Sequence, residues 1–224
     1  MLHSFGNLNQ NKIFYVIRRS PGAGMFSNVI FVMNHLLIAK QHNFIPVVDM
    51  KNFPTIYNEK NIVNGTYNAW EYYFEKVSKY TLEEVYKSKN VFITNNNFVF
   101  GFDHKIYNNK KFSKIKNKIK IRKDIYRTVD IFKKKYFKNQ KILGIHYRGT
   151  SYKTSANHPF PATKIQMLNL INKKLNKNSF DKIFLCTEDK SMFDYIKSIY
   201  GSKIIHFNSF RSKYDDAFKK YPRK

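Results

Sequence analysis

The sequence predicts an α/β protein made of two Rossmann-like units, one in each half of the chain. In both halves apolar strands alternate with stretches of helical apolar spacing, and this alternation is typical of a parallel sheet. In the first half a glycine-containing turn joins strand to helix, as in a β-turn-α-β unit. Two such units are expected to face each other across a cleft, where ligands bind.

The first unit is expected to open with an apolar strand at 13–17 and a turn at 18–24. Ser27 and Asn28 are candidates to cap the helix that follows, because short polar side chains accept hydrogen bonds from the first helical amides. A second strand at 44–50 closes the unit.

The sequence then becomes aromatic-rich and irregular, with a helix expected at 82–88 and a strand at 91–94. In the stretch 124–136 four apolar residues recur on one face and predict an amphipathic helix; they are Ile125, Val129, Phe132 and Tyr136.

The elements expected in the second half are a strand at 142–147, a helix at 162–175, a strand at 183–186, a helix at 191–200 and a strand at 203–207. Gly201 is the expected stop of the second helix. Little sequence follows the last strand, so this unit is expected to be incomplete. The predicted domains are 1–140, which includes a basic helical region at 104–141, and 141–224.

The composition, 224 residues with 42% hydrophobic side chains, fits a globular protein with a real core. No apolar run reaches about 18 residues and the start lacks the pattern of a signal peptide, so the cytoplasm is the expected location. One cysteine, Cys186, excludes an internal disulfide framework and a multi-cysteine zinc site. Within its strand it is expected to be a small buried hydrophobe.

The formal net charge is +26, and half of it lies in 104–141, which contains 15 Lys or Arg but only two acidic residues, Asp124 and Asp130. Only seven of the 41 basic residues are Arg, and compositional drift explains much of the Lys content. The basic region is interpreted as a solvated surface or as one attracted to acidic membrane lipid or to a phosphate-bearing substrate. Nucleic-acid binding is a further alternative.

The turn PGAGMFSN at 21–28 is the first candidate binding element, because glycines let the backbone approach a ligand and a helix N-terminus attracts negative charge. It lacks the GK[ST] ending of a P-loop and the third glycine of a dinucleotide fingerprint, which argues against a kinase or a dehydrogenase. A tight turn without a ligand is the alternative.

The segment HYRGTSYK at 146–153 is the second candidate. Alternation sends His146 and Arg148 to one face at the carboxyl end of a parallel strand, where ligands bind in open sheets. The fork of an arginine suits a diphosphate, and Thr150 adds a hydroxyl group. A buried structural histidine with a surface arginine is the alternative.

The next strand ends in Thr187, Glu188 and Asp189, which adds hydroxyl and carboxylate groups to the same edge of the sheet. The alternative for this trio is a helix cap, because Asp189 or Ser191 stands just before a predicted helix.

In content and order these motifs resemble the superfamily of inverting fucosyltransferases, which includes the core α1,6-fucosyltransferases, the rhizobial nodulation fucosyltransferase and the protein O-fucosyltransferases. The family's His-x-Arg-Arg-Thr-Asp-Lys motif is similar to HYRGTSYK, and a His-Pro pair (His158 and Pro159) and the strand ending at 187–189 follow it. The glycine turn, VVDMKNF at 47–53 and NAWEYYFE at 68–75 extend the resemblance over nearly the whole chain.

The resemblance implies a GT-B-like fold and a transfer of fucose from GDP-fucose, or of a similar nucleotide sugar, to a glycan acceptor, with no metal and no cofactor. It assigns the diphosphate to Arg148, places His146 beside the nucleotide, and makes the first domain the acceptor side and the second the donor side. The implied catalytic residues are Arg148, Asn28, Glu188 and Asp189; the implied substrate-binding residues are Gly22, Gly24, His146, Arg148, Thr150, Lys153 and Thr187. The base stays open between Glu188, Asp189 and Asp49.

The chain departs from the family motif in three places: Gly149 replaces its second arginine, Ser151 replaces its acidic residue, and Lys153 stands one residue late. The chain is also expected to end before the family's third donor-site motif. Two alternatives for function are therefore a catalytically impaired transferase fragment or interaction protein, and a basic nucleic-acid-binding protein. A lipid-linked glycan at the inner face of the membrane is one expected form of the acceptor, and no specific nucleic acid is expected as a partner.

Overall fold

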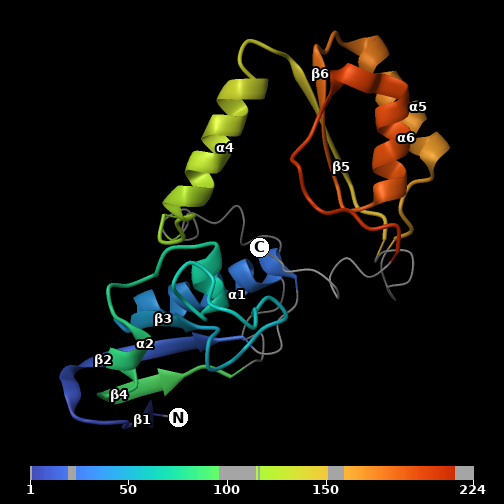
Figure 1. Ribbon diagram of the computed structural model, residues 1–224. Coiled ribbons are helices and arrows are strands. Elements are labelled where there is room, and N and C mark those ends of the chain that lie inside the picture. Colours follow the sequence, from blue (N-terminus) through green and yellow to red (C-terminus); the bar gives the residue numbers. More distant parts are fainter. Residues whose placement is uncertain (1, 20–23, 96–114, 116, 151–158, 215–224) are drawn as a thin grey trace. The chain divides into compact units, whose positions relative to one another are not determined.

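The computed structural model describes residues 2–19, 24–95, 115, 117–150 and 159–214 (Figure 1). The chain divides into two units, residues 1–126 and 127–223. Each unit contains its own sheet, and most strand pairs in these sheets are parallel. The predicted α/β class is therefore confirmed.

The sheet of the first unit has the strand order β1-β4-β2-β3. Its members are β1 (Leu2–His3), β2 (Leu8–Arg18), β3 (Ile45–Asp49) and β4 (Ser88–Ile93). β2 lies between β3 and β4 and is parallel to both, whereas β1 pairs antiparallel with β4. The two predicted strands at 13–17 and 44–50 are present, and the edge strand β1 was not predicted.

Helix α1 (Met25–Gln41) carries the main apolar cluster of this unit. Phe31, Val32 and Leu36 are buried together with Ile17 of β2 and Trp70 of the short 3-10 helix η1 (Ala69–Tyr72). Val32 and Leu36 belong to the apolar residues of 29–39 whose helical spacing predicted this helix.

The predicted capping of α1 by Ser27 and Asn28 is wrong, because the helix begins at Met25, after Gly24. The cap residue is Gly24, which has no side chain to accept a hydrogen bond from the first helical amides. The Met25 amide instead donates to the hydroxyl oxygen of Tyr57, at 2.7 Å. A partner more than 30 residues away thus takes over a task that is usually local.

The predicted helix at 82–88 is a single turn, α2 (Leu82–Val85), because the chain joins the sheet as β4 from Ser88 onward. Thr81 and Glu84 form a capping box at its start. The Ser88 hydroxyl donates to the Glu84 carbonyl at 2.7 Å, which satisfies one carbonyl at its end.

The second unit contains a three-stranded parallel sheet in the order β5-β6-β7. Its elements are α4 (Lys123–Tyr136, whose first turn belongs to the first unit), β5 (Ile142–Tyr147), α5 (Lys164–Lys177), β6 (Lys182–Thr187), α6 (Lys190–Tyr200), the 3-10 helix η4 (Gly201–Lys203) and β7 (Ile204–Ile205). Gly201, with φ of +49°, ends α6 as predicted. Of the strand predicted at 203–207 only Ile204–Ile205 is present: η4 takes position 203, and the strand ends before 206.

Helices α5 and α6 cover one face of this sheet (Figure 1). Ile145 and Leu185 from the strands pack there with Ile171 of α5 and Ile196 of α6. The strand residues between them point to the opposite face, so Cys186 is exposed. The expectation that Cys186 is buried is therefore wrong.

The amphipathic helix predicted at 124–136 is present as α4, yet none of its residues is buried. Among the four predicted face residues, Phe132 stacks on Phe207, with 3.9 Å between the ring centres, and Tyr136 packs against Phe132, with 4.7 Å between the ring centres. Val129 keeps 51% of its surface exposed. No helix in the described part of the chain has the length and apolar character needed to cross a membrane.

One buried histidine in the first unit predicts a pH dependence of stability. His35 of α1 is 2% exposed, and its Nδ1 atom lies 2.8 Å from the Tyr15 hydroxyl oxygen. Burial, and then the positive charge of Arg19, lowers the pKa of His35 to about 4. The unfolded chain takes up this proton from about pH 6.5 downward, whereas the folded chain does not until about pH 4, so protonation favours unfolding in that window.

We expect the free energy of unfolding to fall by about 2 kcal/mol more in the wild type than in His35→Gln between pH 7 and pH 5. Urea denaturation at several pH values measures this difference, and His42→Gln, at an exposed histidine, is the matched control. Equal pH slopes for the wild type and His35→Gln would contradict the assignment.

Candidate functional site

The carboxylate of Glu188 joins the ends of β5 and β6. Its Oε1 atom accepts hydrogen bonds from the Gly149 amide at 2.9 Å, and from the Thr150 amide and hydroxyl at 3.3 Å each. Gly149 and Thr150 follow β5 directly, while Glu188 follows β6. One carboxylate oxygen thus satisfies two backbone amides that a phosphate group could otherwise occupy.

Asp189 lies next to this contact and caps α6. Its Oδ1 atom accepts from the Met192 amide at 2.9 Å, and the residue is 3% exposed. The helix-cap alternative for Asp189 is therefore present in the structure. Burial raises the pKa of Tyr147, and the negative charges of Asp189 and Glu188 raise it further.

Gly149 is required by this packing. A Cβ atom at this position would lie 2.5 Å from Asp189 Oδ2 and 2.5 Å from Tyr147 Cε1. No side chain fits there unless Asp189 or Tyr147 moves. The family motif has an arginine at this position, and its Cβ atom would meet the same clash. The local packing therefore explains why Gly149 departs from the motif.

His146 and Arg148 lie on the exposed face of the sheet at its carboxyl end. The alternative of a buried structural histidine is excluded, because the buried positions of this strand are Ile145 and Tyr147. His146 is the register partner of Cys186 on β6, so the imidazole and the thiol stand on adjacent strands. Both side chains are exposed, and their common orientation stays a prediction.

Thr187 and Ser212 complete the edge. Thr187 is 6% exposed, and its hydroxyl oxygen accepts from the Asp189 amide at 3.0 Å. The Ser212 amide donates to the Glu188 carbonyl at 2.9 Å, and the Ser212 carbonyl accepts from the Lys190 amide at 2.8 Å. Sequence reasoning missed Ser212, because no periodicity marks the segment that returns to this edge after β7.

In the first unit, Gly24 and Asn28 lie at the start of α1, near the end of β2. Asn28 is 2% exposed, and its Oδ1 atom accepts from Arg19 Nε at 3.4 Å. Arg19 is itself buried and lies over the ring of Phe31, 4.6 Å from its centre. Burial lowers the pKa of Arg19. No sequence pattern marks Arg19 as a partner of Asn28, because the fold creates this contact.

Asp49 is fully buried and heavily hydrogen-bonded. Its oxygens accept from the amides of Lys51 and Asn52, from the Asn52 side chain and from the Tyr86 hydroxyl at 2.7 Å. Burial and the adjacent carboxylate raise the pKa of Tyr86. Asp49 therefore fixes the turn after β3 and is a poor candidate for a base.

The segments VVDMKNF and NAWEYYFE share a buried apolar cluster, and the Asn68 side chain joins them by hydrogen bonds. Asn68, 1% exposed, accepts from the Met50 amide at 3.0 Å and donates to the Val48 carbonyl at 2.8 Å. In the structure these two segments therefore pack against each other at the end of β3.

Gly22 and Lys153 lie outside the described residues. Over the part of the chain that is described, no group of three or more His, Cys, Asp or Glu side chains is close enough to hold a metal ion.

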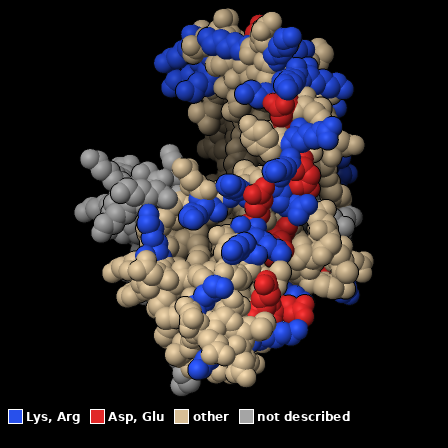
Figure 2. Space-filling model, turned by 90° about the vertical axis from the view of Figure 1, so that its left-hand side faces the viewer, with Lys and Arg blue, Asp and Glu red and all other residues tan. Residues whose placement is uncertain are grey.

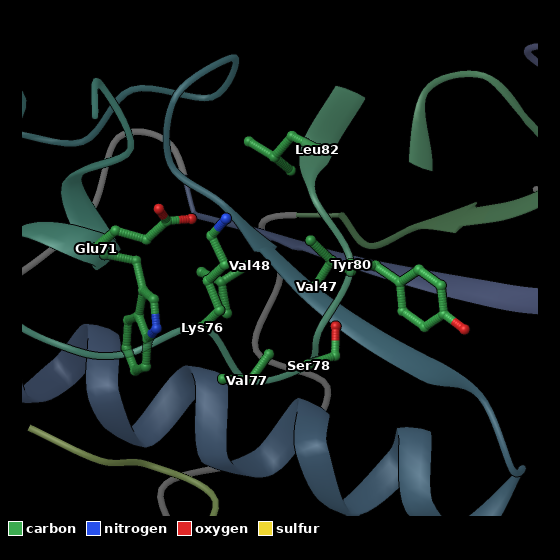
Figure 3. Close-up of a pocket in the computed structure, with 9 residues that line it drawn as sticks. Val47, Val48, Glu71, Lys76, Val77, Ser78, Tyr80 and Leu82 are labelled. Atoms are coloured by element: carbon green, nitrogen blue, oxygen red, sulfur yellow. The ribbon is translucent and has the colours of Figure 1, made fainter. Parts of the chain in front are cut away.

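The small pocket in Figure 3 lies between β3, η1 and the segment 76–82 of the first unit. Its volume of about 10 Å³ suits roughly one water molecule. The hydroxyl of Ser78, which lines it, is buried and has no hydrogen-bond partner among the described residues. We interpret this cavity as a hydration site, since it is too small for a substrate.

The fold is similar to that of solved fucosyltransferase structures. The crystal structure of fucosyltransferase NodZ from Bradyrhizobium is 16% identical in sequence, with a TM-score of 0.54 over 88% of this chain and 79% of that chain. NodZ alpha-1,6-fucosyltransferase co-crystallised with GDP is 13% identical, with a TM-score of 0.53 over 88% of this chain and 79% of that chain. The same enzyme soaked with GDP-fucose is 15% identical, with a TM-score of 0.52 over 88% and 78%.

No protein-family model matches the chain, and no curated protein matches it in sequence. The comparisons therefore show a fucosyltransferase-like fold.

The close packing at Gly149 predicts that Gly149→Ala lowers the free energy of unfolding by about 1–3 kcal/mol, because the new methyl group displaces the Asp189 cap. Thermal unfolding followed by circular dichroism measures this loss. Gly144→Ala is the matched control: it lies in β5, five residues before Gly149, and a Cβ there meets nothing within 4 Å. A Gly149→Ala variant as stable as Gly144→Ala would show that the packing is not as described.

Proposed function

We propose that the protein is a glycosyltransferase that takes its sugar from GDP-fucose or a similar nucleotide sugar. The observation that carries the proposal is the edge formed by β5 and β6, where Arg148 and His146 are exposed beside a loop fixed by Glu188. This edge belongs to a fucosyltransferase-like fold, and structures of that fold were crystallised with GDP and soaked with GDP-fucose.

In the proposed reaction an acceptor hydroxyl attacks the anomeric carbon of the sugar with inversion, and GDP leaves. The leaving diphosphate gains negative charge, which the Arg148 guanidinium stabilises without a metal ion. His146 lies beside it, on the same face of the sheet. Gly24 and the buried Asn28 at the start of α1 belong to the acceptor side in this proposal.

The contacts of the acidic residues narrow the choice of base. Asp189 is engaged as the cap of α6, and Asp49 is buried among four donors. The described hydrogen bonds of the Glu188 carboxylate all use Oε1. Glu188 is therefore the proposed base, acting through Oε2, and it also positions the loop that follows Arg148.

A second candidate is a transferase-like protein that binds GDP but does not transfer sugar. Gly149 favours this alternative, because its packing leaves no room for the second cation of the family motif. The two candidates share the nucleotide site and differ in turnover. Release of GDP from GDP-fucose in the presence of glycan acceptors separates them.

The role of Arg148 predicts that Arg148→Ala weakens GDP binding by about 10- to 100-fold, the usual effect of losing hydrogen bonds to a charged group. Arg148→Lys keeps the charge but loses the bidentate geometry, so we expect an intermediate loss. Isothermal titration with GDP measures both. Arg127→Ala, at an exposed arginine of α4, is the control and should bind as the wild type does.

A wild-type protein that gives neither heat nor a shift in melting temperature with GDP or GDP-fucose would contradict the nucleotide site itself. Equal affinities for the wild type and Arg148→Ala would contradict only the role of Arg148.

A further inference from the structure

One end of the second unit gathers lysines that the proposed reaction does not use. We name it the lysine-rich end and define it by the residues 133–141, 173–182 and 197–203, which contain eleven lysines and one aspartate. These residues are the last turns of α4, α5 and α6 and the starts of the strands that follow. In a parallel sheet with returning helices, all of these segments lie at the amino end of the strands.

Figure 1 shows the end of α4, the starts of β5 and β6 and the end of α5 at the top of this unit. Figure 2 shows Lys and Arg side chains gathered at the same upper end, with little acidic surface among them. The single aspartate, Asp181, accepts from the Lys141 amide at 2.6 Å. The lysine-rich end is therefore a strongly positive surface.

Helix stability explains only some of these lysines. A lysine in the last turn of a helix interacts favourably with the helix dipole, which accounts for Lys135, Lys177 and Lys197. It does not account for Lys141, which directly precedes β5, or for Lys182, which begins β6.

Three of the lysines lie where the three strands begin. Lys141 precedes β5, Lys182 begins β6, and Lys203 precedes β7. Lys182 is the register partner of Ile142, so Lys141 lies one residue before that pair and on the other face of the sheet. Lys182 Nζ donates to the Ser202 carbonyl at 2.9 Å, and Lys141 Nζ lies over the Phe180 ring. The three charges are thus spread over this end of the sheet, and an anionic surface that covers it attracts all of them.

Exposed apolar side chains accompany the charges. Tyr136 at the end of α4 is 38% exposed, and Ile199 near the end of α6 is 44% exposed. Beside Tyr136 lies a hollow of about 550 Å³ lined by Phe207, Lys135 and Lys182, among others. Lysines with aromatic and aliphatic groups between them match the interface of an acidic bilayer, where the apolar groups enter the headgroup layer.

We infer that the lysine-rich end is a docking surface for an acidic phospholipid membrane. A membrane fits better than a nucleic acid because the cations are all lysines: none of the seven arginines of the chain lies in the three defining ranges. Arginine is the side chain favoured for bidentate phosphate recognition in nucleic acids, whereas lysines suffice for attraction to a charged lipid surface.

The lysine-rich end and the proposed nucleotide site lie at opposite ends of the same strand. Arg148 stands at the opposite end of β5 from Lys141, roughly 20 Å away at 3.3 Å per residue. This separation exceeds the screening length of about 8 Å at physiological ionic strength. Lipid binding at one end therefore leaves GDP binding at the other unchanged.

Flotation of the full chain with vesicles tests the inference. We expect binding to vesicles of phosphatidylcholine with phosphatidylglycerol and none to phosphatidylcholine alone. The quadruple variant Lys138→Gln, Lys141→Gln, Lys174→Gln, Lys177→Gln should bind acidic vesicles at least about 100-fold more weakly, since each lysine contributes about fivefold. All four side chains are exposed, and thermal unfolding checks that the variant is folded.

The matched control removes the same charge from the first unit, as Lys51→Gln, Lys60→Gln, Lys76→Gln, Lys89→Gln, four exposed lysines. It should retain wild-type binding to acidic vesicles. Equal losses in both quadruple variants, or wild-type binding without preference for acidic lipid, would overturn the inference. So would tighter binding to duplex DNA or to RNA than to acidic vesicles, if the second-unit variant alone lost it. A GDP titration in parallel keeps the two proposals separate, because failure of either leaves the other measurable.

Discussion

The hydrogen bonds from Gly149 and Thr150 to Glu188 are the constraint on which the rest of the candidate site depends. They tie the end of β5 to the end of β6 through a single carboxylate oxygen. Because Gly149 is held this way, it packs so closely on Asp189 that it has no space for a side chain. The same strand ends anchor Ser212 and present Arg148 and His146 on the open face.

The repeating parts of the fold could be predicted from the sequence, and the parts set by distant contacts could not. β5 matches its predicted bounds, and α6 ends at Gly201, because strand alternation and a left-handed glycine are local signals. The start of α1 was misplaced because its partner is Tyr57 rather than a neighbouring side chain. The exposure of Cys186 depends on which face of the sheet the helices cover, which the spacing of one strand does not reveal.

In the candidate site, too, local sequence signals could be predicted and distant contacts could not. Arg148 and His146 could be predicted because a motif and an alternating strand place them together at the carboxyl end of the sheet. Ser212 and Arg19 could not, because their roles arise from contacts with Glu188 and Asn28 that the fold creates. The same contacts change what the acidic residues can do: Asp189 is a cap, and Glu188 positions a loop.

We propose that the Arg148 guanidinium, and not the Gly149 and Thr150 amides, holds the diphosphate, since Glu188 already accepts hydrogen bonds from those amides. A crystal structure of the protein with GDP tests this claim most directly. We expect a phosphate oxygen within hydrogen-bond distance of the Arg148 guanidinium, with Glu188 still accepting from the Gly149 and Thr150 amides. A diphosphate that displaces Glu188 from the amides, or GDP bound away from this edge, would contradict it.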